Sequence, residues 1–348
     1  MRQIWITSAG APEVLKVQEA ADPEAGPNQA RVRVKASGIN FADLSARQGM
    51  YPDAPKIPCV VGYEVSGIVD QVGAGVDNVK VGDRVFAMPR FGGYSDVVVL
   101  PATNILHMPD AMSFEEAAAL PVVYLTAHHM MFYTGYLREG SIILLHSAAG
   151  GVGLAALQLA KTKKCIVIGT ASPSKHDFLR AEGCQYPLDS ALSGEALKQA
   201  VREVLKSMGI PDDKFHGVDL VLDPVGGPSW TDGYNLLGPG GRLVAFGFSA
   251  ATAGKTRNLF KAIYRLLQMK WWNPMKLMND NKTISGVNMG HLFDRVDLLL
   301  PQFKALTEMY LRGEIKPYVD RTFPFSEAAA AHHYIHDRKA KGKVLLVP

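Results

Sequence analysis

The chain has 348 residues. A chain of this length is too long for one ordinary hydrophobic core, so we expect two domains. Hydrophobic residues make up 47% and charged residues 20%, which excludes a disordered chain. The 37 basic and 33 acidic residues give a formal net charge of +4, which is too balanced to indicate a nucleic-acid-binding surface.

Short β-type runs separated by glycine and proline dominate the first hundred residues, at 30–37, 67–72, 84–88 and 95–100. Such runs with turn signals between them predict a compact, barrel-like β domain. A helix start follows, with Ser113 as the N-cap and Glu116 at the capping-box position.

Strands and helices alternate from about Pro121 onward. The predicted strands lie at 142–146, 166–169, 218–223, 242–247 and 283–287, and the helices between them include 153–164 and 175–181. This βαβ order predicts an α/β fold with a doubly wound parallel sheet. A helix near 295–312 and a strand at 343–347 follow, and we expect that strand to return to the first domain. The predicted parts are therefore 1–121, 122–291 and a C-terminal segment, 292–348.

The three cysteines, Cys59, Cys165 and Cys184, form no Cys-x-x-Cys pair. A disulfide framework and a four-cysteine zinc site are therefore excluded, and we expect a reducing, cytoplasmic location. We expect no secretory signal, because the first residues lead directly into strand-like sequence. The uncharged stretches 117–137 and 141–160 contain histidines and either proline or glycines, so we interpret them as buried elements rather than membrane spans.

A glycine-rich turn joins the predicted strand 142–146 to the helix after it. Ala148, Gly150 and Gly153 occupy the three small-residue positions of a dinucleotide-binding fingerprint. Gly150 would let the backbone approach a pyrophosphate, and Gly153 would let the helix pack closely on the strand. The amides of Ala149, Gly150, Gly151, Val152 and Gly153 would then face the negative charge. The alternative is a plain tight turn in an α/β protein.

The end of the next strand favours NADP(H) over NAD(H). An NAD site places an acid about 20 residues beyond the first small residue, where it binds the ribose 2′-hydroxyl. Here Ser172 and Lys175 occupy that region, and the first acid is Asp177. A lysine can bind a 2′-phosphate that a carboxylate would repel. The alternative is that Lys175 is a solvated lysine in the first turn of a helix.

Motifs along the whole chain resemble the quinone oxidoreductase branch of the medium-chain dehydrogenase/reductase superfamily. They are SGINFADLSARQGMYP (37–52), AAALP (117–121) and HSAAGGVG (146–153). Within that branch, GTASPSKH (169–176), DPVGG (223–227) and GYNLLGPGG (233–241) are most similar to the vesicle amine transport protein group. The resemblance implies a Rossmann domain plus a GroES-like, β-rich catalytic domain.

The resemblance also implies the residues of the site. Asn40, Asp43 and Tyr51 match the catalytic segment beside the nicotinamide. Asp189 is followed by Ser190, where many relatives carry a tyrosine, so Lys175 is the main support for NADP(H). Beyond the glycine-rich turn, Ser172 and Lys175, the implied cofactor-binding residues are Asn40, Tyr124, Thr126, Thr170, Asp223, Phe246, Gly247, Phe248, Val287, Asn288 and Lys343.

Zinc is not expected, although zinc-bearing members of the superfamily share the fold. Where they carry Gly-His-Glu and a cysteine, this chain has Gly62-Tyr63-Glu64 and Asn40. A phenol with a pKa near 10 and a neutral amide are poor zinc ligands. The structural-zinc cysteine cluster is also missing, since residues 90–93 run directly into the next strand.

Two groups of histidines could suggest other chemistry. His332 and His336 lie one helical turn apart and could share a metal, but no further ligand is evident, so we expect a solvated surface helix with His333. His128 and His129 are interpreted as core or interface histidines rather than proton donors.

The function predicted from these features is zinc-independent hydride transfer from NADPH to a quinone or an α,β-unsaturated carbonyl compound. Asn40 and Tyr51 are the expected hydrogen-bond donors, and the final proton would come from Tyr51 or water. The alternative is an NADPH-binding scaffold with little catalytic activity. In that case the aromatic and basic stretch 255–282 would contact a membrane surface or a partner. Otherwise this stretch would be a lid over the cofactor or would support a homodimer, which we expect.

Overall fold

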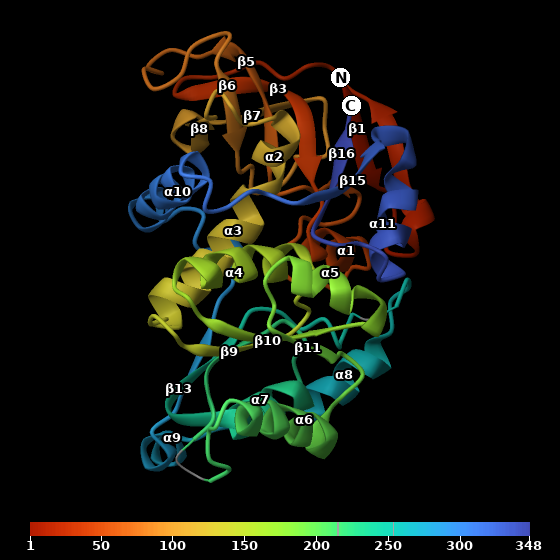
Figure 1. Cartoon of the computed structure of the whole chain (residues 1–348). Helices are drawn as coiled ribbons and strands as arrows, with labels where there is room; N and C mark the ends of the chain where they lie inside the picture. The colour runs from red at the N-terminus through yellow and green to blue at the C-terminus, as the bar shows by residue number, and fades with distance from the viewer. Residues whose placement is uncertain (214–215, 253) are drawn as a thin grey trace. The chain divides into compact units, whose positions relative to one another are not determined.

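The computed structural model describes residues 1–213, 216–252 and 254–348, which form two compact units (Figure 1). Unit 1 comprises Met1–Leu125, Gly254–Arg257 and Met289–Pro348, and unit 2 comprises Thr126–Ala253 and Asn258–Asn288. Within the described residues, no helix is long and apolar enough to cross a bilayer.

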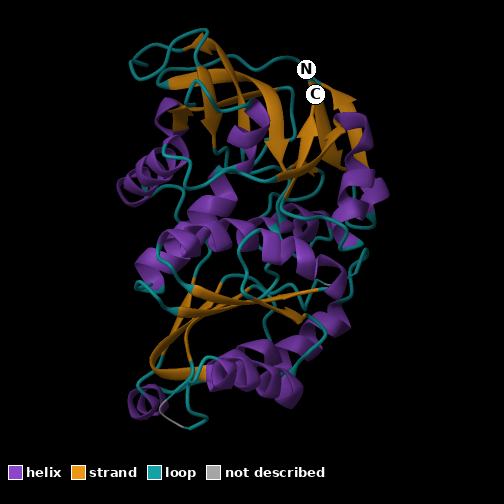
Figure 2. Cartoon of the chain, viewed as in Figure 1, coloured by secondary structure: helices purple, strands orange, loops and turns teal. Residues whose placement is uncertain are grey.

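Unit 1 is rich in β-structure (Figure 2). Its larger sheet has the order β15-β16-β3-β5-β6-β8, with β7 paired to β3, and its smaller sheet has the order β2-β1-β4. Alternate residues of β3 are buried, among them Ala30, Val32, Val34 and Ala36, as the two-residue period of a half-buried strand requires. The strands are β1 (Arg2–Ile6), β2 (Leu15–Glu19), β3 (Gln29–Gly38), β4 (Cys59–Val60), β5 (Val65–Val72), β6 (Arg84–Ala87), β7 (Val97–Pro101), β8 (Ile105–His107), β15 (Val319–Pro324) and β16 (Lys343–Val347).

The helices of unit 1 lie between and after these strands. The predicted capping box of α2 is confirmed, since the Glu116 amide donates to Ser113 Oγ and the Ser113 amide donates to Glu116 Oε2, both at 3.1 Å. The helical elements are η1 (Pro12–Val14), α1 (Phe41–Arg47), η2 (Ala102–Asn104), α2 (Phe114–Ala119), η5 (Met289–His291), α10 (Val296–Leu311), η6 (Phe325–Glu327) and α11 (Ala328–His336). Helix α3 (Pro121–His128) begins in unit 1 and continues into unit 2.

The C-terminal strand returns to the first domain, as predicted. β16 pairs antiparallel with β3 and parallel with β15. Leu345 lies opposite Gly38, and the Ile39 amide donates to the Val344 carbonyl at 3.0 Å. This pairing brings Lys343 next to the residues that follow β3.

Unit 2 has a six-stranded parallel sheet with the order β11-β10-β9-β12-β13-β14, which confirms the doubly wound α/β prediction. Helices α4 and α5 cover one face of the sheet, and α6 and α7 cover the other (Figure 1). The strands are β9 (Ile142–Leu145), β10 (Ile166–Ala171), β11 (Tyr186–Asp189), β12 (Val218–Asp223), β13 (Leu237–Ala245) and β14 (Thr283–Gly286). The helical elements are η3 (His129–Thr134), α4 (Gly151–Thr162), η4 (Pro173–Lys175), α5 (His176–Ala181), α6 (Gly194–Ser207), α7 (Pro228–Leu236), α8 (Leu259–Leu267) and α9 (Pro274–Asp280).

The expected solvated histidine helix is wrong for His332, which is 0% exposed. Helix α11 packs onto the core of unit 1, and the His332 ring meets the Tyr94 ring edge-on at 6.1 Å. One turn later, Arg47 Nη2 lies 2.6 Å from His336 Nε2. Among the described residues, no three His, Cys, Asp or Glu side chains are grouped as metal ligands.

The contact between His336 and Arg47 predicts acid sensitivity. Burial, followed by the Arg47 charge, lowers the pKa of His336 from 6.5 to about 4. The unfolded chain therefore takes up this proton before the folded chain does, and the free energy of unfolding should fall as the pH drops from 6.5 toward about 4. Replacing His336 by glutamine, which keeps an acceptor for Arg47, should reduce that fall in the thermal unfolding midpoint.

His333 is the matched control for this experiment, since it pairs with Glu13 at the surface at 2.6 Å. His333→Gln should leave the acid-induced loss of stability in place. An identical pH dependence in the wild type and in His336→Gln would contradict the assignment.

Candidate functional site

Three polar side chains of unit 1, Asn40, Glu64 and Lys343, form a bonded group that we call the polar trio. Lys343 Nζ donates to Asn40 Oδ1 at 2.7 Å, and Asn40 Nδ2 donates to Glu64 Oε1 at 2.9 Å. Lys343 Nζ also forms an ion pair with Glu64 Oε1. Glu64 and Lys343 are 0% and 3% exposed, so this is a buried charge pair with a neutral amide bridging its two ends.

Asp43, predicted as catalytic, is fully buried beside the polar trio. Its Oδ2 accepts the Asn40 amide at 2.7 Å, and its Oδ1 accepts the Gly62 amide at 3.0 Å. Burial raises its pKa to about 7, against the lowering effect of the Asn40 amide and the Lys343 charge. A carboxyl group held by two backbone amides orients the loops that carry Asn40 and Tyr63, and we assign it a positioning role.

Three aromatic rings of unit 1 gather around Tyr63, and we call these four side chains the aromatic cluster. The centroid of Tyr63 lies 6.2 Å from Tyr51, 5.2 Å from Phe91 and 6.2 Å from Phe293. Burial raises the pKa of the Tyr63 phenol above its ordinary value. Tyr63 directly precedes Glu64, so the cluster and the polar trio share one loop.

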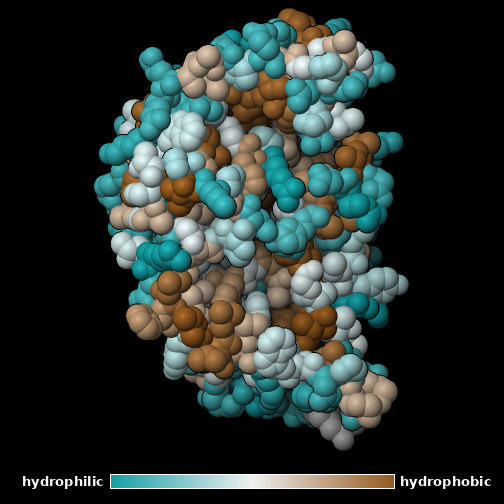
Figure 3. Space-filling view, turned by 180° about the vertical axis from the view of Figure 1, so that it is seen from behind, coloured by the Kyte–Doolittle hydropathy of each residue, from teal (hydrophilic) through white to brown (hydrophobic). Residues whose placement is uncertain are grey.

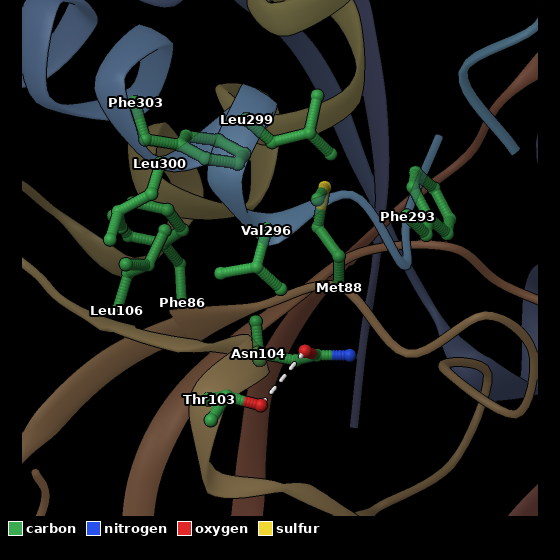
Figure 4. Close-up of a pocket in the computed structure, with 11 residues that line it drawn as sticks. Phe86, Met88, Thr103, Asn104, Leu106, Phe293, Val296, Leu299, Leu300 and Phe303 are labelled. Carbon is green, nitrogen blue, oxygen red and sulfur yellow. Dashed lines mark hydrogen bonds between the residues drawn. The ribbon is translucent and has the colours of Figure 1, made fainter. Parts of the chain in front are cut away.

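An apolar pocket continues from this cluster, because Phe293 lines both (Figure 4). Helix α10 contributes Val296, Leu299, Leu300 and Phe303, and the facing wall comes from residues of β6, η2 and β8 and from Met88. The polar side chains of its lining are Thr103 and Asn104, and Thr103 Oγ1 donates to Asn104 Oδ1 at 3.3 Å. No side chain that lines the pocket is titratable. The pocket can hold apolar groups and offers no acid or base.

The predicted phosphate-binding turn of unit 2 lies at the start of α4. Gly150 is the N-cap residue, and no side chain caps the helix, so the first amides are available to an anion. A Cβ on Gly153 would lie 2.6 Å from both the Ser147 carbonyl oxygen and the Ala148 carbonyl carbon. The close packing that the sequence predicts at Gly153 is therefore present.

Thr170 and Asp223 line the same edge of the parallel sheet. Thr170 Oγ1 lies 3.2 Å from His146 Nδ1, and the Ala148 amide donates to the Thr170 carbonyl at 2.9 Å. Asp223 Oδ1 accepts the Val225 amide at 2.6 Å, and its Oδ2 accepts from Ser229 Oγ at 2.6 Å. Thr170 thus supports the glycine-rich turn, and Asp223 shapes the loop after β12.

Other predicted cofactor residues follow neighbouring strands at this edge. The Phe246 amide donates to the Asp223 carbonyl at 3.1 Å, and the Val287 amide donates to the Ala245 carbonyl at 2.9 Å. The Phe248 ring stacks on Trp230 at 5.7 Å, and Gly247 and Asn288 lie at the surface. The carboxyl ends of adjacent parallel strands form the usual ligand-binding edge of such sheets.

Ser172 and Lys175 lie at the two ends of η4, directly after β10, and both are half-buried. Ser172 Oγ lies 3.4 Å from Ser174 Oγ. Tyr124 and Thr126 are buried on α3. The structure thus places the predicted residues that follow β9, β10, β12, β13 and β14 at one sheet edge, and in unit 1 it joins Asn40 to Lys343.

The sequence analysis missed Glu64, Phe91 and Phe293 as members of the site. Glu64 entered only as the residue after Tyr63 in a zinc-binding motif that this chain lacks. An acid in a run of small and apolar residues was the signal that could have identified it, because such an acid needs a buried cationic partner. No local pattern distinguishes Phe91 or Phe293.

Comparisons with known proteins agree with this architecture. The family model for the alcohol dehydrogenase GroES-like domain matches residues 26–110, and that for the zinc-binding dehydrogenase domain matches residues 202–346. The human synaptic vesicle membrane protein VAT-1 homolog is 39% identical, over 100% of this chain and 86% of the relative. A Pseudomonas aeruginosa quinone oxidoreductase is 33% identical, over 100% of this chain and 99% of the relative.

One solved structure extends the comparison. The Escherichia coli quinone oxidoreductase complexed with NADPH superimposes with a TM-score of 0.85 at 29% identity, covering 100% of both chains. The arrangement of the β-rich part and of the parallel sheet is therefore shared with that enzyme.

Proposed function

The chain belongs to the medium-chain dehydrogenase/reductase superfamily, in the quinone oxidoreductase branch near the VAT-1 homologues, and we propose that it reduces quinones or α,β-unsaturated carbonyl compounds without a metal. It is an NADPH-dependent oxidoreductase of that superfamily. The identity of the acceptor and the absence of a catalytic metal are the new elements of the proposal.

One observation carries the choice of acceptor: the neutral amide donor of Asn40 is bonded to Glu64, which directly follows Tyr63 of the aromatic cluster. Asn40 Nδ2 and the Tyr51 phenol are donors without full charge, and they stabilise a developing oxyanion less strongly than a metal does. Quinones and enones suit them because charge in the transition state spreads over a conjugated system. The half-buried ring of Tyr51, which lies edge-on to the buried ring of Tyr63, provides apolar surface for such an acceptor.

Zinc fits poorly at the positions where the family model's name implies it. The side chains there are a neutral amide, Asn40, and a buried phenol, Tyr63, whose pKa burial raises further. The carboxylate of Glu64 is already paired with the Lys343 ammonium, which would repel a second cation. These residues support a reaction in which hydrogen bonds replace a Lewis acid.

Elemental analysis tests the metal-free reaction. We expect no stoichiometric zinc in the purified protein, and we expect chelator treatment to leave turnover and the thermal unfolding midpoint unchanged. One tightly bound zinc per chain would contradict the proposal.

NADPH fits the glycine-rich edge of unit 2. The uncapped amides at the start of α4 would bind the pyrophosphate, and the close approach at Gly153 keeps that turn tight. Ser172 and Lys175 would bind the 2′-phosphate. When bound, this cofactor supplies the hydride, and the residues of the chain orient it and stabilise charge on the acceptor.

Replacing Lys175 by alanine should weaken NADPH binding about tenfold, the size of one charge-assisted contact, and should barely affect NADH. Fluorescence titration of both cofactors measures the two dissociation constants. Lys163→Ala, at the C-cap of α4, is the matched control and should change neither. Equal losses for NADPH and NADH in Lys175→Ala would exclude its role at the 2′-phosphate.

The direct test of the function is NADPH oxidation with a panel of quinones, enones and isolated ketones. We expect turnover with the first two classes and none with a primary alcohol and NADP⁺ in the reverse direction. A protein that binds NADPH yet reduces nothing on the panel would favour a scaffold.

A second candidate function, contact with an anionic membrane surface, is favoured by the solvent-facing side of α8. Phe260 and Leu267 are 89% and 80% exposed, while Arg265 on the other side of the helix is half-buried and donates to Gln268 Oε1 at 2.8 Å. The apolar stripe of this amphipathic helix therefore faces outward. The α8 patch consists of Leu259, Phe260, Ile263, Tyr264, Leu266 and Leu267.

The basic residues near the patch favour an anionic membrane surface as its partner. Residues 254–279 contain six basic residues and no acid. Arg257 and Lys270 are exposed, whereas Lys276 is paired with Asp280 at 2.6 Å. Apolar and aromatic side chains beside lysine and arginine are typical of helices that lie in the interface of anionic bilayers. Figure 3, which views the molecule from behind, shows hydrophobic residues gathered at the lower left, on the side where α8 lies in Figure 1. The name of the human relative, a vesicle membrane protein homolog, agrees with this candidate.

Vesicle flotation separates the two functions. The protein should float with phosphatidylserine-containing vesicles and not with phosphatidylcholine alone, and Phe260→Gln with Leu267→Gln should abolish flotation. Val81→Gln, an exposed apolar residue of unit 1, is the control. A patch variant that changes only the oligomeric state in sedimentation would instead support the predicted homodimer. The cytoplasmic location stays a prediction.

A further inference from the structure

The polar trio has an arrangement that points to a role for Glu64 and Lys343 in the reaction. We propose that these two residues position the Asn40 carboxamide and polarise it, so that a buried ammonium group strengthens the N–H donor offered to the acceptor. The inference rests on the proposed function, since it names how the donor of that site is made effective.

The orientation of the carboxamide follows from the chemistry of its partners. An ammonium group has only donors, so Lys343 Nζ must face Oδ1, and a carboxylate has only acceptors, so Glu64 must face Nδ2. A flipped amide would place donor against donor and acceptor against acceptor. The two charges therefore fix which end of Asn40 is the donor.

The side-chain oxygen of Asn40 is bonded to Lys343, although Asn40 stands at the N-terminus of α1. Asn40 is the N-cap of α1, where asparagine normally accepts a backbone amide, yet the Asp43 amide donates to the Asn40 carbonyl at 3.0 Å and Asn40 Oδ1 accepts from Lys343 Nζ. The Asp43 carboxylate accepts the Asn40 amide instead. Helix α1 thus keeps one polar cap contact, and the Asn40 side chain is held by the polar trio.

One hydrogen of Asn40 Nδ2 remains weakly bonded. The first goes to Glu64 at 2.9 Å, whereas the nearest other acceptor, the Gly38 carbonyl, lies at 3.5 Å. Lys343 withdraws electron density from Oδ1, and in a low-dielectric environment this makes the remaining N–H a stronger donor. Asn40 is only half-buried, so this N–H can reach an acceptor oxygen.

The backbone around the polar trio is shaped to hold it. A Cβ on Gly38 would lie 2.7 Å from Cγ and Cδ of Glu64, so glycine makes room for this side chain. Glu64 Oε2 accepts the Val122 amide at 2.7 Å, which fixes the second carboxylate oxygen. The pairing of β16 with β3 brings Lys343 to the same place.

Three variants test the inference. Lys343→Met leaves the Glu64 carboxylate buried and unpaired, which can unfold the protein, so the decisive variant is Lys343→Met combined with Glu64→Gln. This double variant removes both charges while a neutral amide still bonds to Asn40. Lys339→Met, which removes an exposed lysine near the same strand, is the matched control.

We expect the double variant to fold with an unfolding midpoint near that of the wild type. Lys343 is also a predicted cofactor-binding residue, so kcat is measured at saturating NADPH, with the dissociation constant of NADPH determined separately. Its kcat for a quinone should fall about tenfold, because one donor is weakened rather than deleted, with a smaller change in KM. Lys339→Met should retain the kcat of the wild type. A folded double variant with undiminished kcat would overturn the inference.

A second measurement does not depend on turnover. With ¹⁵N-labelled asparagine, the Asn40 side-chain amide protons should resonate downfield in the wild type and return toward the ordinary range in the double variant. Unchanged resonances would also overturn the inference. If the wild type reduces no acceptor yet shows this shift, the proposed function fails while the polarisation of Asn40 stands.

Discussion

Turnover is expected to fall about a hundredfold when Tyr51 is replaced by phenylalanine, the usual loss when one oxyanion donor is removed. The Tyr51 ring would keep its edge-on contact with Tyr63, 6.2 Å between centroids, so the aromatic surface for the acceptor is retained. NADPH affinity should stay nearly unchanged, because the phenol is not assigned to the dinucleotide phosphates. Steady-state kinetics with a quinone and a separate NADPH titration measure the two effects.

The control for this experiment is Tyr136→Phe, which removes the hydroxyl of an exposed tyrosine in unit 2 and should change neither quantity. If Tyr51→Phe keeps full turnover on every accepted substrate, the Tyr51 hydroxyl is not a donor in the reaction and its ring only lines the site. In that case Asn40 and water would be the remaining donors.

The second large effect is expected at the glycine-rich turn. In Gly153→Ala the new methyl group would lie 2.6 Å from backbone atoms of Ser147 and Ala148, which cannot rotate away as a side chain can. The start of α4 would have to move, at a cost of about 1–3 kcal/mol in the free energy of unfolding. NADPH binding should weaken strongly as well, since the same amides would bind the pyrophosphate. Denaturant unfolding and NADPH titration measure both losses.

Gly150→Ala separates packing from cofactor approach. A Cβ there would meet only the Ser147 carbonyl oxygen, at 3.3 Å, so stability should be nearly unchanged. NADPH affinity should still fall, because the methyl group occupies the space through which the pyrophosphate approaches the backbone. If Gly150→Ala binds NADPH as tightly as the wild type, the phosphate does not lie at this turn.

The glycine-rich turn itself was predictable because its signals are local. A buried strand, three small residues and a helix follow one another within about a dozen positions, and each has its own physical requirement. The same holds for the capping box of Ser113 and Glu116 and for the strands 218–223 and 343–347, whose predicted bounds match β12 and β16. Strand β13 begins five residues earlier than predicted, because its pairing with β12 continues past an irregularity to Leu237.

The sequence by itself therefore determined the fold class, the glycine-rich turn and the absence of the usual zinc ligands, since these depend on periodicity, small residues and side-chain type. Only the tertiary structure decided what surrounds each functional group. Asn40 and Lys343 are 303 positions apart and meet because β16 adds to the sheet beside β3. His332 is buried because of what α11 packs against, and the apolar side of α8 faces outward against the usual rule. Periodicity specifies that a helix has an apolar face, but only the contacts made by the rest of the chain specify whether that face is covered.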